Sequence, residues 1–170
     1  MTDLGGRVAR LRVPLGFVFG ALAVWLARPT PRSLAIGASV ALVGEAIRIW
    51  AAGHLEKGRE VTTSGPYRWT RHPLYLGSTL MGVGLAIASA SIIVTALVVL
   101  YLAITLSAAI RTEESHLTGK FGNAYPDYRE GRGAESKRRF SLDRAFRNRE
   151  YRALIGLVVA LTLLWWKATR

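Results

Sequence analysis

Cysteine is absent from this chain of 170 residues, and acidic residues are scarce. Without cysteine the chain has no disulfide, no thiolate nucleophile and no thiolate metal site. Its 11 Asp and Glu residues are outnumbered by 23 Lys and Arg residues, which gives a formal net charge of +12. Yet 51% of the residues are hydrophobic, and the mean hydropathy is +0.24. Because a soluble domain is rarely both so apolar and so basic, this composition points away from that class.

The apolar residues are gathered in runs that alternate with basic segments. This separation indicates an integral membrane protein and not a nucleic-acid-binding protein, whose basic face would cover a soluble core. We predict an all-α fold, a polytopic membrane bundle with about five transmembrane helices, formed by one domain over residues 1–170. The expected spans are residues 13–27, 33–50, 74–88, 92–110 and 153–166. The first, third and fifth are shorter than the ~20 residues of a typical crossing, so flanking residues or a thinner bilayer must compensate.

Lys and Arg are concentrated in segments 51–73 and 111–152, and few lie in the opposite loops. The positive-inside rule therefore predicts that the N-terminus and both segments face the cytoplasm. The bias towards Ala, Gly and Arg favours a bacterial inner membrane as the location. Because both segments face one compartment, they can form one site. The basic stretch 129–152 suits contact with anionic lipid headgroups.

Residues Gly65–Gly77, with the sequence GPYRWTRHPLYLG, place several polar side chains beside the start of the third apolar run. Pro73 disfavours helical conformation at His72 and is well tolerated in the first turn of the helix that follows. His72 is therefore expected at a helix N-terminus, where free backbone N–H groups can bind a carboxylate or a phosphate. The same pattern also fits a solvated histidine in a plain interfacial cap.

Glu113 and Glu114 follow the fourth run, on a helix that we expect to continue past that run. Glu114 is four residues after Ile110 and three before Leu117, so it falls on the buried stripe of this helix. A carboxylate there is costly unless it is paired or binds a ligand. The alternative is a surface helix in which both acids are solvated or paired with Arg111.

Other polar and small residues allow two interpretations each. Tyr125 and Tyr128 can line an aromatic pocket from one helical face, or lie as aromatics at the membrane interface. Glu45 and Arg48, inside the second run, mark either a functional site or a mutual ion pair. The glycines of the third run either admit a close cofactor or allow another helix to approach.

Two motifs in this order resemble the isoprenylcysteine carboxyl methyltransferase and phospholipid methyltransferase superfamily: GPYRWTRHPLYLG and, later in the chain, EESHLTGKFGNAYPDY over Glu113–Tyr128. The resemblance covers residues 50–130 and implies a small polytopic enzyme that uses S-adenosyl-L-methionine, with no metal. It implies that the cofactor is bound by Tyr67, His72, Pro73, Tyr75, Gly77, Glu113, Glu114, Tyr125 and Tyr128. For catalysis we expect Glu114 at the cofactor and Arg129 holding a carboxylate acceptor. The chain departs from the family pattern after Tyr128, where REGRGAESKRRF contains no proline.

The resemblance implies methyl transfer to a lipophilic acceptor at the cytoplasmic membrane face, such as an isoprenylcysteine carboxylate or another lipid. One alternative is an NADPH-dependent membrane reductase of the sterol type, which shares a similar RHP-x-Y-x-G segment. Another is a non-enzymatic membrane protein that binds lipid through its basic tail. The paired Glu113 and Glu114 and the compact size favour methyl transfer. The residues leave the acceptor open among an isoprenylated cysteine, a phospholipid amine, an isoprenoid and a small thiol.

Overall fold

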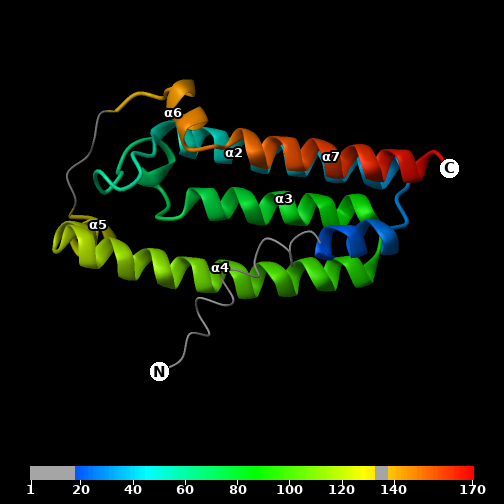
Figure 1. Cartoon of the computed structure of the whole chain (residues 1–170), viewed down its shortest axis with the longest axis horizontal. Helices are drawn as coiled ribbons and strands as arrows, with labels where there is room; N and C mark the ends of the chain where they lie inside the picture. The colour runs from blue at the N-terminus through cyan, green and yellow to red at the C-terminus, as the bar shows by residue number, and fades with distance from the viewer. Residues whose placement is uncertain (1–17, 133–137) are drawn as a thin grey trace.

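The structure, a computed structural model, describes residues 18–132 and 138–170 (Figure 1). These residues form helices, loops and turns, and no strand occurs among them, so the all-α prediction is confirmed. Part of the first expected span, residues 13–27, lies outside the described residues. The helices are residues 18–26, α2 (Pro31–His54), the short 3₁₀ helix η1 (Gly65–Arg68), α3 (Pro73–Ser89), α4 (Ile92–Phe121), α5 (Ala124–Arg129), α6 (Leu142–Arg147) and α7 (Tyr151–Ala168).

Three helices, α2, α4 and α7, are long and apolar enough to cross a membrane, and α3 is a shorter apolar helix of 17 residues. Together they form a helical membrane bundle. Helix α4 has 30 residues. At 1.5 Å per residue it is about 45 Å long, whereas the hydrocarbon core of a bilayer is ~30 Å thick. The helix is therefore longer than the core, and it continues past residue 110 to Phe121, which confirms the predicted continuation.

Local sequence explains where the helices begin. Thr30 caps α2, because its hydroxyl accepts from the backbone N–H of Ser33 at 3.1 Å while the Ser33 hydroxyl accepts from that of Thr30 at 2.9 Å. Ser91 caps α4 through a single bond, since its hydroxyl accepts from the backbone N–H of Val94 at 3.4 Å. Pro31 and Pro73 lie in the first turns of α2 and α3, where the missing N–H of proline leaves no bond unmade.

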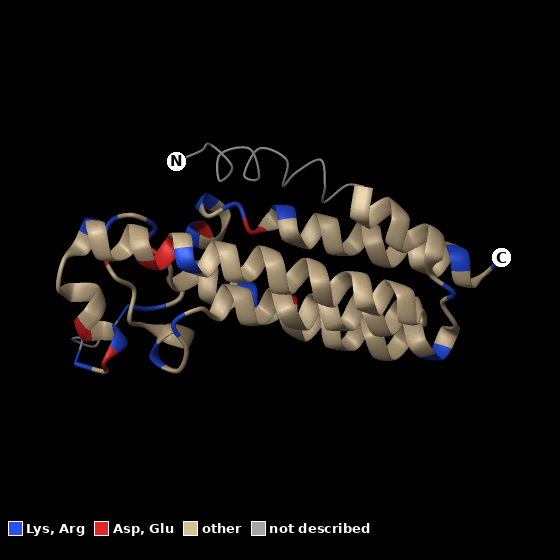
Figure 2. Ribbon diagram, turned by 90° about the horizontal axis from the view of Figure 1, so that it is seen from below, with Lys and Arg blue, Asp and Glu red and all other residues tan. Residues whose placement is uncertain are grey.

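Helix α3 lies between the pair α2 and α7 on one side and α4 on the other (Figure 1). Helices α5 and α6 and the loop 55–72 lie together at one end of this bundle. Figure 2 shows that most Lys, Arg, Asp and Glu residues gather at that end. We call it the polar end and define it as residues 55–72, 113–132 and 138–150.

The interface between α2 and α3 is built from glycines that let the two backbones touch. A Cβ atom on Gly44 would lie 2.6 Å from the carbonyl oxygen of Gly77, and one on Gly84 would lie 2.5 Å from the carbonyl oxygen of Gly37. Real Cβ atoms do not approach backbone so closely, so a larger residue would force the helices apart. Small residues have this role in many membrane helix pairs, where close contact replaces hydrophobic burial as the source of association.

A buried ion-pair network joins α2, α3 and α7. The Arg48 Nε atom lies 2.6 Å from the Glu150 carboxylate and 3.8 Å from that of Glu45. The Arg48 guanidinium also donates to the Ser78 hydroxyl and to the carbonyl of Leu74. The pairing of Glu45 with Arg48 is therefore one edge of a larger network, and Glu150 is the nearer partner.

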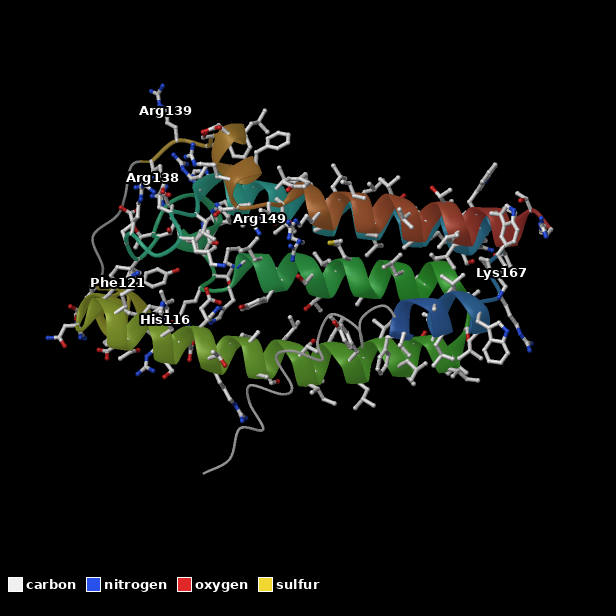
Figure 3. All side chains as sticks on the ribbon, in the orientation of Figure 1. His116, Phe121, Arg138, Arg139, Arg149 and Lys167 are labelled. Carbon is white, nitrogen blue, oxygen red and sulfur yellow. The ribbon has the colours of Figure 1, made fainter. Side chains whose placement is uncertain are left out.

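Lys167 fixes the helix of residues 18–26 to the opposite end of the bundle (Figure 3). Its ammonium donates to the carbonyl oxygens of Val24 and Trp25 at 2.8 and 2.6 Å. These carbonyls belong to the last turn of the helix, where they lack helical partners and favour a nearby cation.

Candidate functional site

His72 stands at the junction of the loop 55–72 and α3. Its backbone N–H donates to the Thr70 hydroxyl at 3.3 Å, and its carbonyl accepts from Tyr75 and Leu76, both at 3.0 Å. Pro73 follows directly and is fully buried in the first turn of α3. The expected placement of His72 at a helix N-terminus is thus what the structure shows, and the imidazole is turned towards α4.

Glu114 brings the two sequence motifs together. One of its carboxylate oxygens, Oε1, lies 3.1 Å from His72 Nε2, 3.3 Å from the Tyr125 hydroxyl and 3.5 Å from the Arg71 guanidinium. The His72 contact requires a proton on Nε2, because an ionised carboxylate only accepts hydrogen bonds. The Glu114 side chain is 30% exposed, so it lies between solvent and the bundle and not on an open helix surface. We call these four side chains the Glu114 cluster.

Hydrogen bonding sets the charge state of Glu114. The bond from His72 is the largest influence that holds the pKa of Glu114 below its ordinary value, and the bond from Tyr125 and the charge of Arg71 act in the same direction. Glu114 is therefore an anion at neutral pH. For Tyr125, burial together with the Glu114 charge raises the pKa to about 12, so its hydroxyl stays a donor.

Aromatic side chains surround this cluster on two sides. The Tyr128 hydroxyl donates to the carbonyl of Tyr67 at 2.6 Å, which fastens α5 onto η1. Burial raises the pKa of Tyr128 to about 12 and raises that of Tyr67 further, so both remain neutral. The Tyr125 and Tyr128 rings are 6.2 Å apart, and the His72 ring stacks on Tyr75 at 5.6 Å.

The structure places the other predicted site residues at different distances from the Glu114 cluster. Glu113 is half-buried beside it, close enough for its charge to act on Tyr67. Gly77 faces α2, where a Cβ atom would lie 2.5 Å from Arg48 Cγ. Arg129 is exposed at the end of α5. No ion pair or hydrogen bond of its side chain to the cluster occurs within the described residues.

Sequence reasoning gave Arg71 no specific role in the site and did not foresee an apolar cavity. Arg71 is adjacent to His72 in the motif, so its position in the sequence was a usable signal. The cavity was not readable, because it depends on how helices meet. It has a volume of about 400 Å³ and is lined by the helix of residues 18–26, α3, α4 and α7. Its walls are apolar, with Val98 and Leu102 of α4 among them, whereas Arg48 and Ser78 border it on the side of the polar end.

Comparison with known families gives this membrane bundle an identity at the level of its family. The pattern of the phospholipid methyltransferase family matches residues 15–124. The chain therefore belongs to the phospholipid methyltransferase family. The matched residues include three members of the Glu114 cluster and stop one residue before Tyr125.

Curated relatives match only part of the chain. A cobalt-zinc-cadmium resistance protein, CzcN, of Cupriavidus metallidurans is 38% identical over 97 residues, which are 56% of this chain and 42% of that protein. A nickel-cobalt-cadmium resistance protein, NccN, of Alcaligenes xylosoxydans xylosoxydans is 36% identical over 95 residues, 55% of this chain and 43% of that protein. A protein-S-isoprenylcysteine O-methyltransferase of Schizosaccharomyces pombe is 31% identical over 86 residues, 51% of this chain and 36% of that protein.

The chain thus spans less than half of the length of these curated relatives. No solved structure matches it. Two of the relatives are named for metal resistance. Among the residues that the structure describes, no group of three or more His, Asp or Glu side chains is placed to hold a metal ion.

Proposed function

We propose that this protein is an S-adenosyl-L-methionine-dependent methyltransferase that acts on a lipophilic acceptor. The observation that carries the proposal is the Glu114 carboxylate, which joins His72 and Arg71 of the first motif to Tyr125 of the second. Membership of a methyltransferase family supports the reaction class. We further propose that the polar end faces the cytoplasm of a bacterial inner membrane, since the basic residues gather there.

The residues of the polar end fit the chemical groups of this cofactor. When bound, S-adenosyl-L-methionine supplies a methyl group activated by a sulfonium. Glu113 and the second carboxylate oxygen of Glu114 can accept from an ammonium or from ribose hydroxyls. Arg71 and the first backbone N–H groups of α3 can donate to a carboxylate. Tyr75 and Tyr128 offer ring faces to an adenine.

The acceptor would place its apolar part in the 400 Å³ cavity between α3 and α4. The cavity lies among apolar helices, so a lipid would enter it from the bilayer. The cofactor would reach the Glu114 cluster from the polar end. A hydrocarbon chain in an apolar cavity is favoured by burial, and Arg48 and Ser78 can orient a polar group at the cavity border. Such positioning is the main requirement for methyl transfer, which needs an in-line approach.

The proton balance depends on the acceptor class. A carboxylate acceptor attacks through a lone pair and loses no proton, so no general base is needed. An amine or thiol acceptor must lose one proton, which Glu113 or Glu114 can accept because both lie at the cluster. Arg129 would hold a carboxylate acceptor at the surface of α5 only if that acceptor extends out of the cavity.

Calorimetric titration of the detergent-purified protein with S-adenosylhomocysteine tests the proposal. We expect saturable binding that weakens at least about tenfold in Glu114→Gln, because hydrogen bonds to charged groups are worth more than neutral ones. Glu130→Gln is the matched control, since Glu130 is an exposed carboxylate that pairs with Arg132. Its affinity should equal that of the parent protein.

NADPH titrated in parallel separates the competing classes. Binding of NADPH without S-adenosylhomocysteine would assign the protein to the reductases. Binding of neither compound would leave a lipid-binding membrane protein. An affinity for S-adenosylhomocysteine that is the same in Glu114→Gln and the parent would remove the Glu114 cluster from the site.

A further inference from the structure

A second pocket lies at the polar end, between the loop after α2 and helix α6. It has a volume of about 580 Å³ and is lined by Leu55, Glu56, Lys57, Arg59, Arg144, Arg147 and Asn148. None of these residues belongs to the Glu114 cluster. We call it the basic pocket.

The basic pocket carries more positive charge than its own acid neutralises. Four of its lining side chains are cationic, and Glu56 is the only carboxylate among them. Arg144 Nε donates to Glu56 at 2.9 Å, and this bond holds the pKa of Glu56 below its ordinary value. Lys57 and Arg59 are exposed, and neither has an ion-pair partner within the described part of the chain. The surplus charge therefore faces outward and is available to an anion.

Hydrogen bonds to backbone carbonyls at the end of α2 fix the walls of this pocket. The Asn148 amide donates to the carbonyls of Ala52 and Leu55, both at 2.9 Å, and the backbone N–H of Ser141 donates to that of Gly53 at 3.1 Å. These carbonyls belong to the last turn of α2 and to its cap, where helical partners are missing. Helix α6 is thus docked firmly on the end of α2.

Arg138, which lies outside the pocket, also holds this segment against the loop after α2. Arg138 Nη2 lies 2.8 Å from the Glu60 carboxylate, which ties the start of the α6 segment to the loop. Figure 3 shows the adjacent Arg139 directed away from the body of the protein. Arg138 is therefore neutralised internally, whereas Arg139 is exposed and does not line the basic pocket.

Helix α6 directly precedes the apolar helix α7. Helix α7 starts at Tyr151, four residues after α6 ends, and its 18 residues span about 27 Å, close to the ~30 Å of a hydrocarbon core. With α7 across the hydrocarbon core, α6 would lie at headgroup level. Two large apolar side chains on one face of α6 are open to the surroundings, with Leu142 61% and Phe146 63% exposed. An apolar face beside basic residues is typical of a helix that lies in the interface plane.

We propose that the basic pocket binds the phosphate of an anionic membrane phospholipid, while Leu142 and Phe146 contact the acyl chains of the same leaflet. Charge complementarity selects the phosphate, and the exposed apolar face selects a lipid over a soluble anion. The site lies outside the Glu114 cluster, so the inference does not depend on the proposed methyl transfer. Its consequence is a fixed height of α6 and of the loop 55–59 relative to the membrane surface.

Native mass spectrometry of the delipidated protein in detergent tests this inference. Phosphatidylglycerol and phosphatidylcholine with identical acyl chains are titrated against the parent protein and the double variant Lys57→Gln/Arg59→Gln. We expect tighter binding of phosphatidylglycerol than of phosphatidylcholine by the parent. The ratio of the two affinities should be about tenfold smaller in the double variant, since each cation near a membrane surface contributes to anionic lipid binding. High salt should reduce the preference of the parent.

The control variant Arg111→Gln/Arg139→Gln removes the same charge from exposed positions outside the pocket. It should keep the preference for phosphatidylglycerol. An equal loss in both double variants would mean that diffuse electrostatic attraction, and not the basic pocket, causes the preference. Equal affinity of the parent for the two lipids would exclude the site. Competition by inorganic phosphate at concentrations as low as those of the lipid would show a soluble anion as the ligand and overturn the proposal.

Discussion

Two neighbours of α3, the helices α2 and α4, are bound to it in opposite ways. Towards α2 the helix is in backbone contact, through glycines that leave no room for a side chain. Towards α4 it packs through side chains, such as Leu102 against Gly82, beside a cavity of about 400 Å³, and Val94 is the single buried residue of α4. At the polar end, His72 and Arg71 join the start of α3 to α4 through Glu114. At the opposite end, the two helices are joined by the turn at Ala90 and Ser91.

This contrast separates a rigid part of the molecule from a part that can admit a ligand. A helix pair in backbone contact cannot open without losing many close contacts at once. A pair that meets through side chains, such as Leu102 against Gly82, can admit a lipid without such a loss. The Glu114 cluster, which we propose binds the cofactor, joins the start of α3 to α4. A cofactor bound there would therefore also hold α3 and α4 together at the polar end.

The largest expected effect comes from removing Glu150, which anchors the rigid side. In Glu150→Ala the Arg48 guanidinium loses its nearest partner while still largely buried, and breaking a buried pair in this way costs about 3 kcal/mol. Thermal unfolding in detergent measures the loss. The exposed carboxylate variant Glu130→Ala should be nearly neutral, and equal stability of the two variants would contradict the anchoring role of Glu150.

Two glycines of α3 test the contrast between its faces directly. A Cβ on Gly84 would meet the backbone of Ala41 and Gly37, which cannot move without displacing α2. A Cβ on Gly82 would meet the end of the Leu102 side chain, which can rotate into the cavity. We expect Gly84→Ala to lower the free energy of unfolding by about 2 kcal/mol, as in overpacked interiors.

Gly82→Ala should be tolerated or slightly stabilising, because alanine favours helix. The two variants make the same chemical change two residues apart. Equal destabilisation in denaturant or heat would mean that the two faces of α3 are packed alike.

Filling the cavity should affect ligand binding and leave the fold intact. Val98 lines the cavity, whereas its neighbour Val99 is exposed on the outer face of α4. We expect Val98→Trp to weaken binding of a fluorescent fatty acid about tenfold, because a filled apolar pocket rejects a chain it otherwise accepts. Val99→Trp should bind this probe like the parent. Unchanged probe binding in Val98→Trp would separate the cavity from lipid binding.

The smallest effect is a dependence of stability on pH that Glu114 introduces. Its pKa is lower in the folded protein than in the unfolded chain, so its contribution is present above the ordinary glutamate pKa and disappears as pH falls through the lower folded value. The unfolding temperature of the parent should therefore drop between pH of about 6 and about 3 by slightly more than that of Glu114→Gln. Parallel pH profiles would show that the His72 bond adds no stability.

Sequence reasoning was strongest where chemistry is local. The proline after His72 predicted a helix start, and the apolar spacing around Glu114 predicted that this carboxylate needs a partner. The all-α membrane fold followed from apolar runs of nearly spanning length. The number of spans and the orientation in the membrane stay predictions.

Features that depend on how helices meet were beyond the sequence. Glu150 reads as an ordinary residue at a helix start, and only the docking of α7 on α2 makes it the partner of Arg48. Gly77 belongs to the first motif, yet it faces α2, because its position along the turn of α3 points it away from α4. The cavity likewise arises from spacing between helices, for which a single sequence holds no signal.

Ultraviolet cross-linking with labelled S-adenosyl-L-methionine, followed by peptide mapping, shows where the cofactor binds. We expect label on peptides that contain residues 65–77 or 113–128, abolished by excess S-adenosylhomocysteine and reduced in Glu114→Gln. Label confined to the basic pocket at residues 144–148, or labelling that excess S-adenosylhomocysteine does not suppress, would contradict this expectation.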